Sequence, residues 1–338
     1  MKRTKLLSIL SILAILASCS KSIFNKKYVL AAPVSSDVYV AGFEGNTTMI
    51  WKNGIPLAIT DGSNYSSSNS IFINDTDIYV AGYQNFNVNG IATVWKNGII
   101  TMLTDSTENS SANSIYVNNG DVFVAGADNK GSNAMATLWK NGIATSLTDG
   151  TNDASANSVF VKDADVYVAG YEVSISNNVA KLWKNGIATA LSDSNRYTYA
   201  ESVFVSDTNI YVAGIEFNGS KNVAKLWVNG SETNLTDGSN DAYAQSVCVS
   251  DSAVYVAGGE YNGSKNVAMI WKNGVPIALT DGSQNAYAFS VYVINGDVYA
   301  TGKEYNGTNY VAKVWKNGTS TELTHSNKNA NALAVFVK

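Results

Sequence analysis

The segment Trp51-Lys52-Asn53-Gly54 recurs along the chain every 44 residues. Six copies have this sequence, and the fifth has Val228 in place of the lysine. The copies begin at Trp51, Trp95, Trp139, Trp183, Trp227, Trp271 and Trp315, which are all seven tryptophans of the protein. Asn-Gly between apolar segments is the strongest short-range signal for a tight β-hairpin, because both residues accept positive φ. A repeat of this length that fills a chain determines its whole fold.

One repeat shows the expected unit. Residues 202–205 and 210–213 are short β-branched and aromatic runs bounded by turn residues, which predicts strands buried on both faces. Residues 222–228 predict a third strand, which turns through Asn229-Gly230 into a fourth strand at 231–235. The fourth strand is the most polar, and its alternation favours an outer edge position.

Four antiparallel strands in a unit of this length match one blade of a β-propeller. Seven copies therefore predict an all-β, seven-bladed propeller of four-stranded blades. A parallel β-helix is the alternative, but its rungs need no Asn-Gly hairpin in every copy. A linear array would need polar caps, whereas the terminal copies here are as apolar as the others.

The two ends of the chain predict how the ring closes. The first strand of a unit is expected to begin at Ser70, Ser114, Ser158, Ser202, Ser246, Ser290 and Ala334. The last of these follows the seventh unit, so residues 334–337 have no unit of their own. The N-terminal unit has only residues 28–34 for its first strand. We expect the C-terminal strand to complete the N-terminal blade, which removes both open sheet edges.

The segments A-x-S-V-F-V, D-V-Y-V-A-G and W-K-N-G resemble bacterial extracellular β-propeller repeat proteins, many of which are lipoproteins. The resemblance covers residues 34–338. It implies the propeller fold, but propellers carry many unrelated activities, so it does not specify a function.

The N-terminus predicts a lipoprotein signal peptide over residues 1–18. Cationic residues precede an apolar run at 6–17, which is too short for a membrane-spanning helix. Leu16-Ala17-Ser18-Cys19 resembles a bacterial lipobox, with cleavage before Cys19 and lipidation of its thiol. An ordinary secretory signal is the alternative.

Residues 19–33 are then the lipidated cysteine and a tether, and residues 34–338 are the propeller. Ser20 resembles the sorting residue of outer-membrane lipoproteins. We therefore expect a protein held at the bacterial cell envelope, periplasmic or surface-exposed, through a lipid on Cys19.

Composition limits the partners. The net charge of −4 and the lack of a basic run beyond the N-terminus exclude general nucleic-acid binding. Only 15% of residues are charged, as in many extracellular β-proteins. Cys19 and Cys248 lie in different contexts, so no disulfide framework is expected; Cys248 replaces a Phe or Tyr and is expected in the core. We expect a monomer without a cofactor.

Residues that differ between copies indicate where a ligand could bind, because residues shared by all copies serve the blade itself. They gather on the ring face with the inter-blade connections and the longer loops, where binding residues concentrate. The candidates form an arc in units four to seven: Tyr199, Tyr243, Tyr287, Glu216, Phe217, Glu260, Tyr261, Glu304 and Tyr305. Aromatic rings beside amides and carboxylates suit sugars, and tyrosine-rich loops equally suit proteins. The alternative is that these tyrosines cover the core.

Catalysis and metal binding have weaker support. The aspartates of the Thr-Asp-Gly loops predict Asx turns rather than a calcium site. His325 stands where the other six copies have Asp, and we expect a solvated loop residue. The function predicted is an envelope-anchored binding or scaffold module for a glycan or a protein. The alternatives are an enzyme acting on polysaccharide or peptidoglycan at the mouth of the central channel, and a structural part of an envelope complex.

Overall fold

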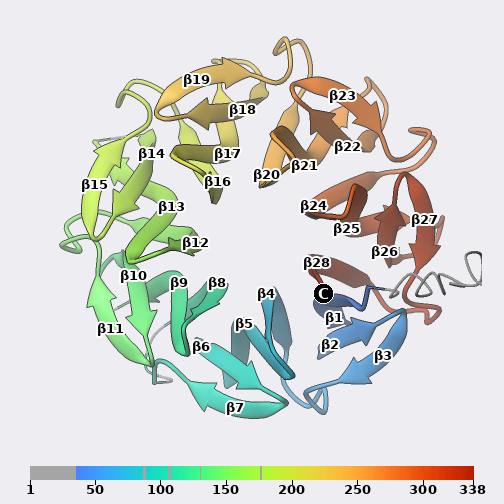
Figure 1. Ribbon diagram of the computed structural model, residues 1–338, viewed down its shortest axis with the longest axis horizontal. Coiled ribbons are helices and arrows are strands. Elements are labelled where there is room, and N and C mark those ends of the chain that lie inside the picture. The colour runs from blue at the N-terminus through green and yellow to red at the C-terminus, as the bar shows by residue number, and fades with distance from the viewer. Residues whose placement is uncertain (1–35, 87–88, 106, 108, 130, 176) are drawn as a thin grey trace, which may run out of the picture. The chain divides into compact units, whose positions relative to one another are not determined.

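The computed structural model describes residues 36–338 apart from 87–88, 106, 108, 130 and 176. The described residues form 28 strands in seven four-stranded antiparallel sheets, which are arranged as the blades of a ring (Figure 1). This confirms the predicted seven-bladed propeller. We number the blades in chain order from the sheet β28-β1-β2-β3. The signal peptide, Cys19 and the tether lie outside the described residues.

Every blade has the same strand order from the axis of the ring outward. The innermost strands are β28 (Ala330–Val337) of blade 1 and β4 (Ser66–Asn74), β8 (Ser110–Asn118), β12 (Ala154–Lys162), β16 (Thr198–Ser206), β20 (Ala242–Ser250) and β24 (Ala286–Ile294). The second strands are β1 (Val38–Glu44), β5 (Asp77–Phe86), β9 (Asp121–Asn129), β13 (Asp165–Ser174), β17 (Asn209–Phe217), β21 (Ala253–Tyr261) and β25 (Asp297–Tyr305). The third strands are β2 (Thr47–Lys52), β6 (Asn89–Lys96), β10 (Ala134–Lys140), β14 (Asn177–Lys184), β18 (Asn222–Val228), β22 (Asn266–Lys272) and β26 (Tyr310–Lys316). The outer strands are β3 (Ile55–Ala58), β7 (Ile99–Met102), β11 (Ile143–Ser146), β15 (Ile187–Ala190), β19 (Ser231–Asn234), β23 (Val275–Ala278) and β27 (Thr319–Glu322).

The Asn-Gly pairs make the outer hairpins, as predicted. Asn53 and Gly54 have φ angles of 52° and 80°, and the other six pairs are similar. Two successive positive φ angles define the type I′ turn, whose twist matches that of the joined strands. Each hairpin leads into an outer strand whose four residues are all exposed.

The core is divided among the seven junctions between blades. Trp271, for example, is fully buried in one cluster with Ala213, Ala224 and Leu226 of the preceding blade. All seven tryptophans are at most 2% exposed. They therefore pack between blades, as expected.

Serine hydroxyls link neighbouring innermost strands. Ser70 Oγ accepts a hydrogen bond from the amide of Ile115 in the next blade, at 3.1 Å. The same bond recurs at five further junctions, at 3.1–3.3 Å. At the seventh junction, between blades 1 and 2, Ala334 stands in the serine position and offers no hydroxyl to Ile71.

The last strand closes the ring. β28 pairs with β1 in antiparallel register, from Val38 opposite Val337 to Glu44 opposite Ala330. The backbones of Asp37 and Lys338 exchange two hydrogen bonds, at 2.7 and 2.9 Å. The predicted completion of the N-terminal blade by the C-terminal strand is thus confirmed.

The predicted start of the innermost strands is wrong by four residues. β4 begins at Ser66 rather than Ser70, because a β-bulge between Ser68 and Ser70 interrupts the alternation on which the prediction relied. Equivalent bulges occur in the other six blades. The bulge brings the carbonyl oxygen of Ser67 against Gly82, where a Cβ would lie 1.9 Å from it. Only glycine fits this position.

Candidate binding face

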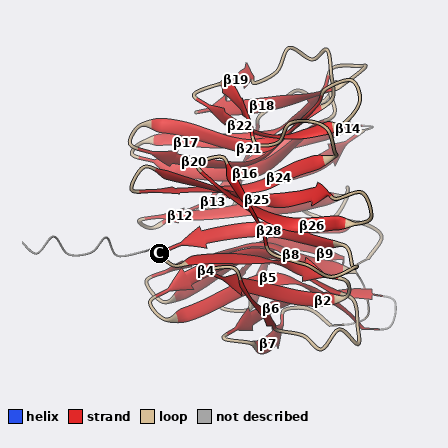
Figure 2. Ribbon diagram, turned by 90° about the vertical axis from the view of Figure 1, so that its right-hand side faces the viewer, coloured by secondary structure: helices blue, strands red, loops and turns tan. Residues whose placement is uncertain are grey.

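The ring has two unlike faces. The turn face carries the Asn-Gly hairpins and the turns between first and second strands. The loop face carries the inter-blade connections and the loops between second and third strands. Figure 2 shows the strands running between these faces, with the C-terminus at one of them. That is the turn face, and Asp37 lies beside Lys338 there. The described chain therefore enters and leaves the ring on the turn face.

A circle of six aromatic side chains lines the central channel near the turn face. It consists of Phe72, Tyr116, Phe160, Phe204, Tyr292 and Phe336, one from each of six innermost strands. Adjacent centroids in this set lie 4.8–5.1 Å apart. Cys248 takes the seventh position and is buried against Phe204, as expected for a core residue. Burial raises the pKa of its thiol to about 11, so the thiolate nucleophile is disfavoured.

The residues at the seven bulges are unlike one another. They are Asn69, Asn113, Asn157, Glu201, Gln245, Phe289 and Leu333. The three asparagines donate hydrogen bonds to carbonyl groups of the next blade, at 3.0–3.1 Å. Asn157 also donates to Glu201, at 3.2 Å. Burial raises the pKa of Glu201 to about 7, against the opposing effect of this hydrogen bond.

The candidate tyrosines lie on innermost strands rather than in loops. Tyr199, Tyr243 and Tyr287 belong to β16, β20 and β24, because these strands start earlier than predicted. The hydroxyl of Tyr243 accepts a hydrogen bond from Asn222 of the preceding blade at 3.3 Å, and that of Tyr287 accepts one from Asn266 at 2.9 Å. These tyrosines therefore connect neighbouring blades at the loop-face end of the channel.

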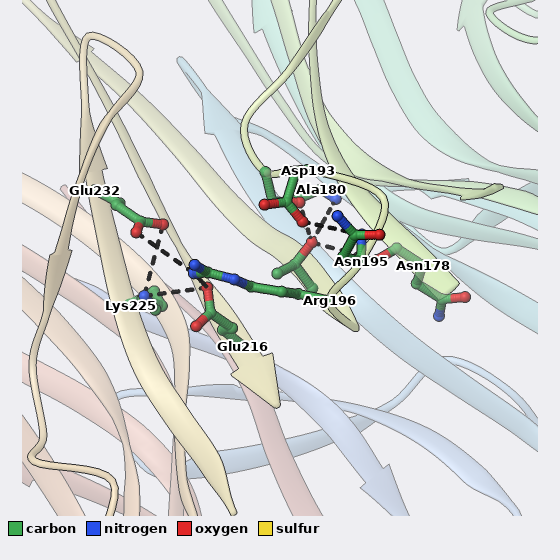
Figure 3. A network of polar contacts seen from close by, with 10 residues as sticks. Asn178, Ala180, Asp193, Asn195, Arg196, Glu216, Lys225 and Glu232 are labelled. Carbon is green, nitrogen blue, oxygen red and sulfur yellow. Dashed lines mark hydrogen bonds and ion pairs between the residues drawn. The ribbon is translucent and has the colours of Figure 1, made fainter. Parts of the chain in front are cut away.

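Glu216 belongs to a charge network (Figure 3). Its side chain is 8% exposed and lies 3.1 Å from Lys225 Nζ, which is 3% exposed, and 3.0 Å from Arg196. Arg196 comes from the loop before β16, and both cations also approach Glu232 of β19. Two cations and two carboxylates balance, so this cluster stabilises the junction of blades 4 and 5. Arg196 could have been singled out from the sequence, because it is the single arginine after Arg3.

Glu304 and Glu260 have different surroundings. Glu304 is paired with Lys313 of its own blade at 2.6 Å. Met269 takes the equivalent position beside Glu260, which has no ion-pair partner among the described residues. Burial, helped by Asp237, raises the pKa of Glu260. Glu216 and Glu260 occupy equivalent positions in successive blades and yet have different surroundings, because the neighbouring third strands supply Lys225 in one case and Met269 in the other.

The remaining candidates lie at the rim of the loop face. Phe217 is 37% exposed, and Tyr261 is partly exposed at the end of β21. Tyr305 contacts Tyr310 edge-on, with centroids 5.4 Å apart. Beside it, Lys303 Nζ lies 4.5 Å from the centroid of Tyr310 and 5.2 Å from that of Tyr287. Burial lowers the pKa of this lysine.

Two hollows lie away from this arc, at the junction of blades 2 and 3. One, of about 360 Å³, is lined by Leu103, Thr104, Asp105, Thr107, Ser110, Asp128 and Asn129. A second, of about 260 Å³, is lined by Tyr83, Asn85, Gly90, Asn109, Ser110, Ser111, Ala127 and Asn129. They share Ser110 and Asn129 and therefore adjoin. The sequence prediction missed this junction because it looked for large residues, whereas small ones create the hollow.

The loop aspartates and His325 behave as expected. Asp61, Asp105, Asp149, Asp193, Asp237 and Asp281 each accept a hydrogen bond from the backbone amide two residues later, at 2.8–3.0 Å. This is the Asx turn. The His325 side chain is 81% exposed. Within residues 36–338, gaps aside, we find neither a cluster of His, Cys, Asp and Glu that could hold a metal nor a helix able to span a membrane.

Comparison with known proteins identifies no family for this chain. No protein-family model matches the chain, and no curated protein matches it. Among solved structures, one titled "Structure of YjhT" is similar at a TM-score of 0.43 and 13% identity, over 75% of this chain and 96% of that chain.

Proposed function

We propose that the protein is a binding module of the bacterial envelope, anchored through a lipid on Cys19, which recognises a glycan or a protein partner with its loop face. One observation carries the proposal. The described chain joins and leaves the ring on the turn face, whereas the predicted arc of residues that differ between copies lies on the loop face.

This arrangement attaches the proposed lipid anchor to one face of the ring. The predicted tether ends at residue 33 and the ring begins at Asp37; the 17 residues after Cys19, 20–36, reach at most about 60 Å when extended. The attachment then lies on the turn face and leaves the loop face free of it. The accessible part of the predicted arc, around Phe217, Tyr261 and Tyr305, faces away from the anchor.

Two experiments test the proposal. Palmitate labelling in cells should mark the wild-type protein and not Cys19→Ser; equal labelling of both would contradict the anchor. A glycan array and pull-down from envelope extract with the mature protein should then show a ligand. Tyr305→Ser and Phe217→Ser should weaken its binding without a change in melting temperature, and loss of stability alone would show that these rings only cover the core.

A second candidate is an enzyme acting on polysaccharide or peptidoglycan, and the observation that favours it is Glu201. This carboxyl group lies among unlike residues on the channel wall, with a pKa of about 7 that suits an acid or a base. Hydrolysis by a pair of carboxylates would need a second acidic group nearby, and none of the other six bulge residues is acidic. Release of sugar fragments from envelope polysaccharide by wild type and not by Glu201→Gln would establish this candidate.

A further inference from the structure

The hollow between blades 2 and 3 can be compared with the same place in the rest of the ring. Equivalent positions carry a third-strand residue and an innermost-strand residue that face each other across each junction. In blades 5 and 6 they are Asn222 and Tyr243, and in blades 6 and 7 Asn266 and Tyr287. In blades 2 and 3 they are Gly90 and Ser111. Both members of the pair are truncated, and both line the 260 Å³ hollow.

The hollow thus occupies the place of a tyrosine ring. At these two junctions, the six-membered ring of a tyrosine fills this place and its hydroxyl accepts a hydrogen bond from an asparagine amide. These tyrosine side chains therefore show the shape and polarity of a group that fits at this place between two blades. A pyranose has a similar ring and carries hydroxyl groups at its edge.

The walls of the hollow fit such a ring. Tyr83 supplies an aromatic side chain, half-buried at the end of β5, and aromatic faces pack against the C–H groups of sugars. The carboxamides of Asn85 and Asn129 have no hydrogen-bond partner among the described residues, so they can each donate and accept. Gly90 keeps this wall open, since a Cβ there would lie 3.3 Å from the carbonyl oxygen of Ser110 and 3.4 Å from both Tyr83 and Asn85. Asn109 is already committed, because its Oδ1 accepts from the Gly90 amide at 2.8 Å.

The adjoining hollow indicates the charge of the ligand. Its ionisable lining residues, among those described, are Asp105 and the 3%-exposed Asp128. Asp128 accepts a hydrogen bond from Ser110, a residue that lines both hollows, at 3.2 Å. Carboxylates accept hydrogen bonds from hydroxyl groups and repel anions. Together the two hollows have the size of a small-ligand site, which typically occupies about 300–1,000 Å³.

We propose that the cleft between blades 2 and 3 binds a neutral sugar residue, stacked on Tyr83 and hydrogen-bonded by Asn85 and Asn129, with further hydroxyl groups directed to Asp128. This site rests on the proposed binding function but lies apart from the tyrosine arc of blades 5–7. Figure 1 places β5, β6, β8 and β9, which build it, on the opposite side of the ring from β20 to β23.

The test fills the cleft with the side chains that fill it elsewhere in the same protein. The mature protein is applied to an array of neutral and acidic oligosaccharides, and the strongest neutral binder is then titrated by calorimetry. Gly90→Asn with Ser111→Tyr should weaken binding at least tenfold with an unchanged or higher melting temperature. Asn129→Ala, which removes one partly exposed amide, should weaken it several-fold and keeps the test valid if the double variant does not fold.

A matched control removes an asparagine amide at the equivalent place in another blade. Asn222→Ala should leave the affinity of the neutral sugar unchanged. Unaltered affinity in both the filled and the Asn129→Ala variants would overturn the site while leaving the binding function intact. Retention of acidic sugars alone would overturn the neutral class. Binding of no sugar, together with capture of a protein by the loop face, would overturn the inference but not the proposed function.

Discussion

Removal of residues 334–338 tests whether ring closure holds the propeller together. The deletion takes away Val335 and Val337, which are 6% and 1% exposed. At about 1.5–3 kcal/mol for each buried side chain, their loss costs about 3–6 kcal/mol. The two backbone hydrogen bonds between Asp37 and Lys338 add about 1–3 kcal/mol. The sum, about 4–9 kcal/mol, is most of the 5–15 kcal/mol by which a typical domain is stable.

We therefore expect the truncated protein to lose cooperative unfolding, or to unfold at a much lower urea concentration than the full-length chain, in titrations followed by tryptophan fluorescence. Adding a synthetic peptide of residues 330–338 to a chain that ends at residue 329 should restore the transition, because the peptide supplies β28. A control, Thr319→Ala in the exposed outer strand β27, should change little. A truncated protein that unfolds at the same urea concentration as the intact one would refute the closure argument.

Three further predictions concern residues that differ between blades. Cys248→Phe should raise the free energy of unfolding by about 0.5–2 kcal/mol, since it completes the circle of aromatic side chains with the residue type of neighbouring copies. A lower melting temperature would show that the channel wall has no room for the phenyl group. Glu201 has its pKa raised from 4.5 to about 7, so its penalty on folding is absent below pH 4.5 and grows until pH 7. Glu201→Gln should therefore leave stability unchanged near pH 4 and raise it by about 3 kcal/mol near pH 8, as measured by chemical unfolding at both pH values. Lys225→Ala should cost about 3–5 kcal/mol, because Lys225 is a buried partner of Glu216, whereas Arg196→Ala, at a half-exposed partner, should cost about 1 kcal/mol; equal losses in thermal unfolding would contradict this ranking.

The fold could be predicted because every blade repeats the same local signals. Asn53-Gly54 specifies a hairpin wherever it stands, and Trp51 needs burial in every copy. The orphan strand at residues 334–337 then leaves one simple way to close the ring. These inferences depend on residues near one another in the sequence, which a repeat presents seven times.

The candidate site depends on pairs that the sequence keeps apart. Tyr243 looks like an exposed loop residue until the bulge after Ala244 extends β20 and brings its hydroxyl to Asn222 of another blade. Gly90 and Ser111 carry no functional signal by themselves. They can be recognised as the walls of a hollow only once the strand register places them across one junction. Glu216 and Glu260 likewise differ through Lys225 and Met269, which lie on neighbouring strands.

The missing serine at Ala334 has a consequence for the motions of the ring. Six junctions each gain a hydroxyl-to-amide bond between innermost strands, and the junction of blades 1 and 2 does not. Blade 1 is also the one blade assembled from both ends of the chain. Slow breathing of the propeller should therefore concentrate there, and the amide of Ile71 should exchange with solvent deuterium sooner than its six counterparts. The propeller is nearly symmetric in shape, and yet we expect it to open first at the junction of blades 1 and 2.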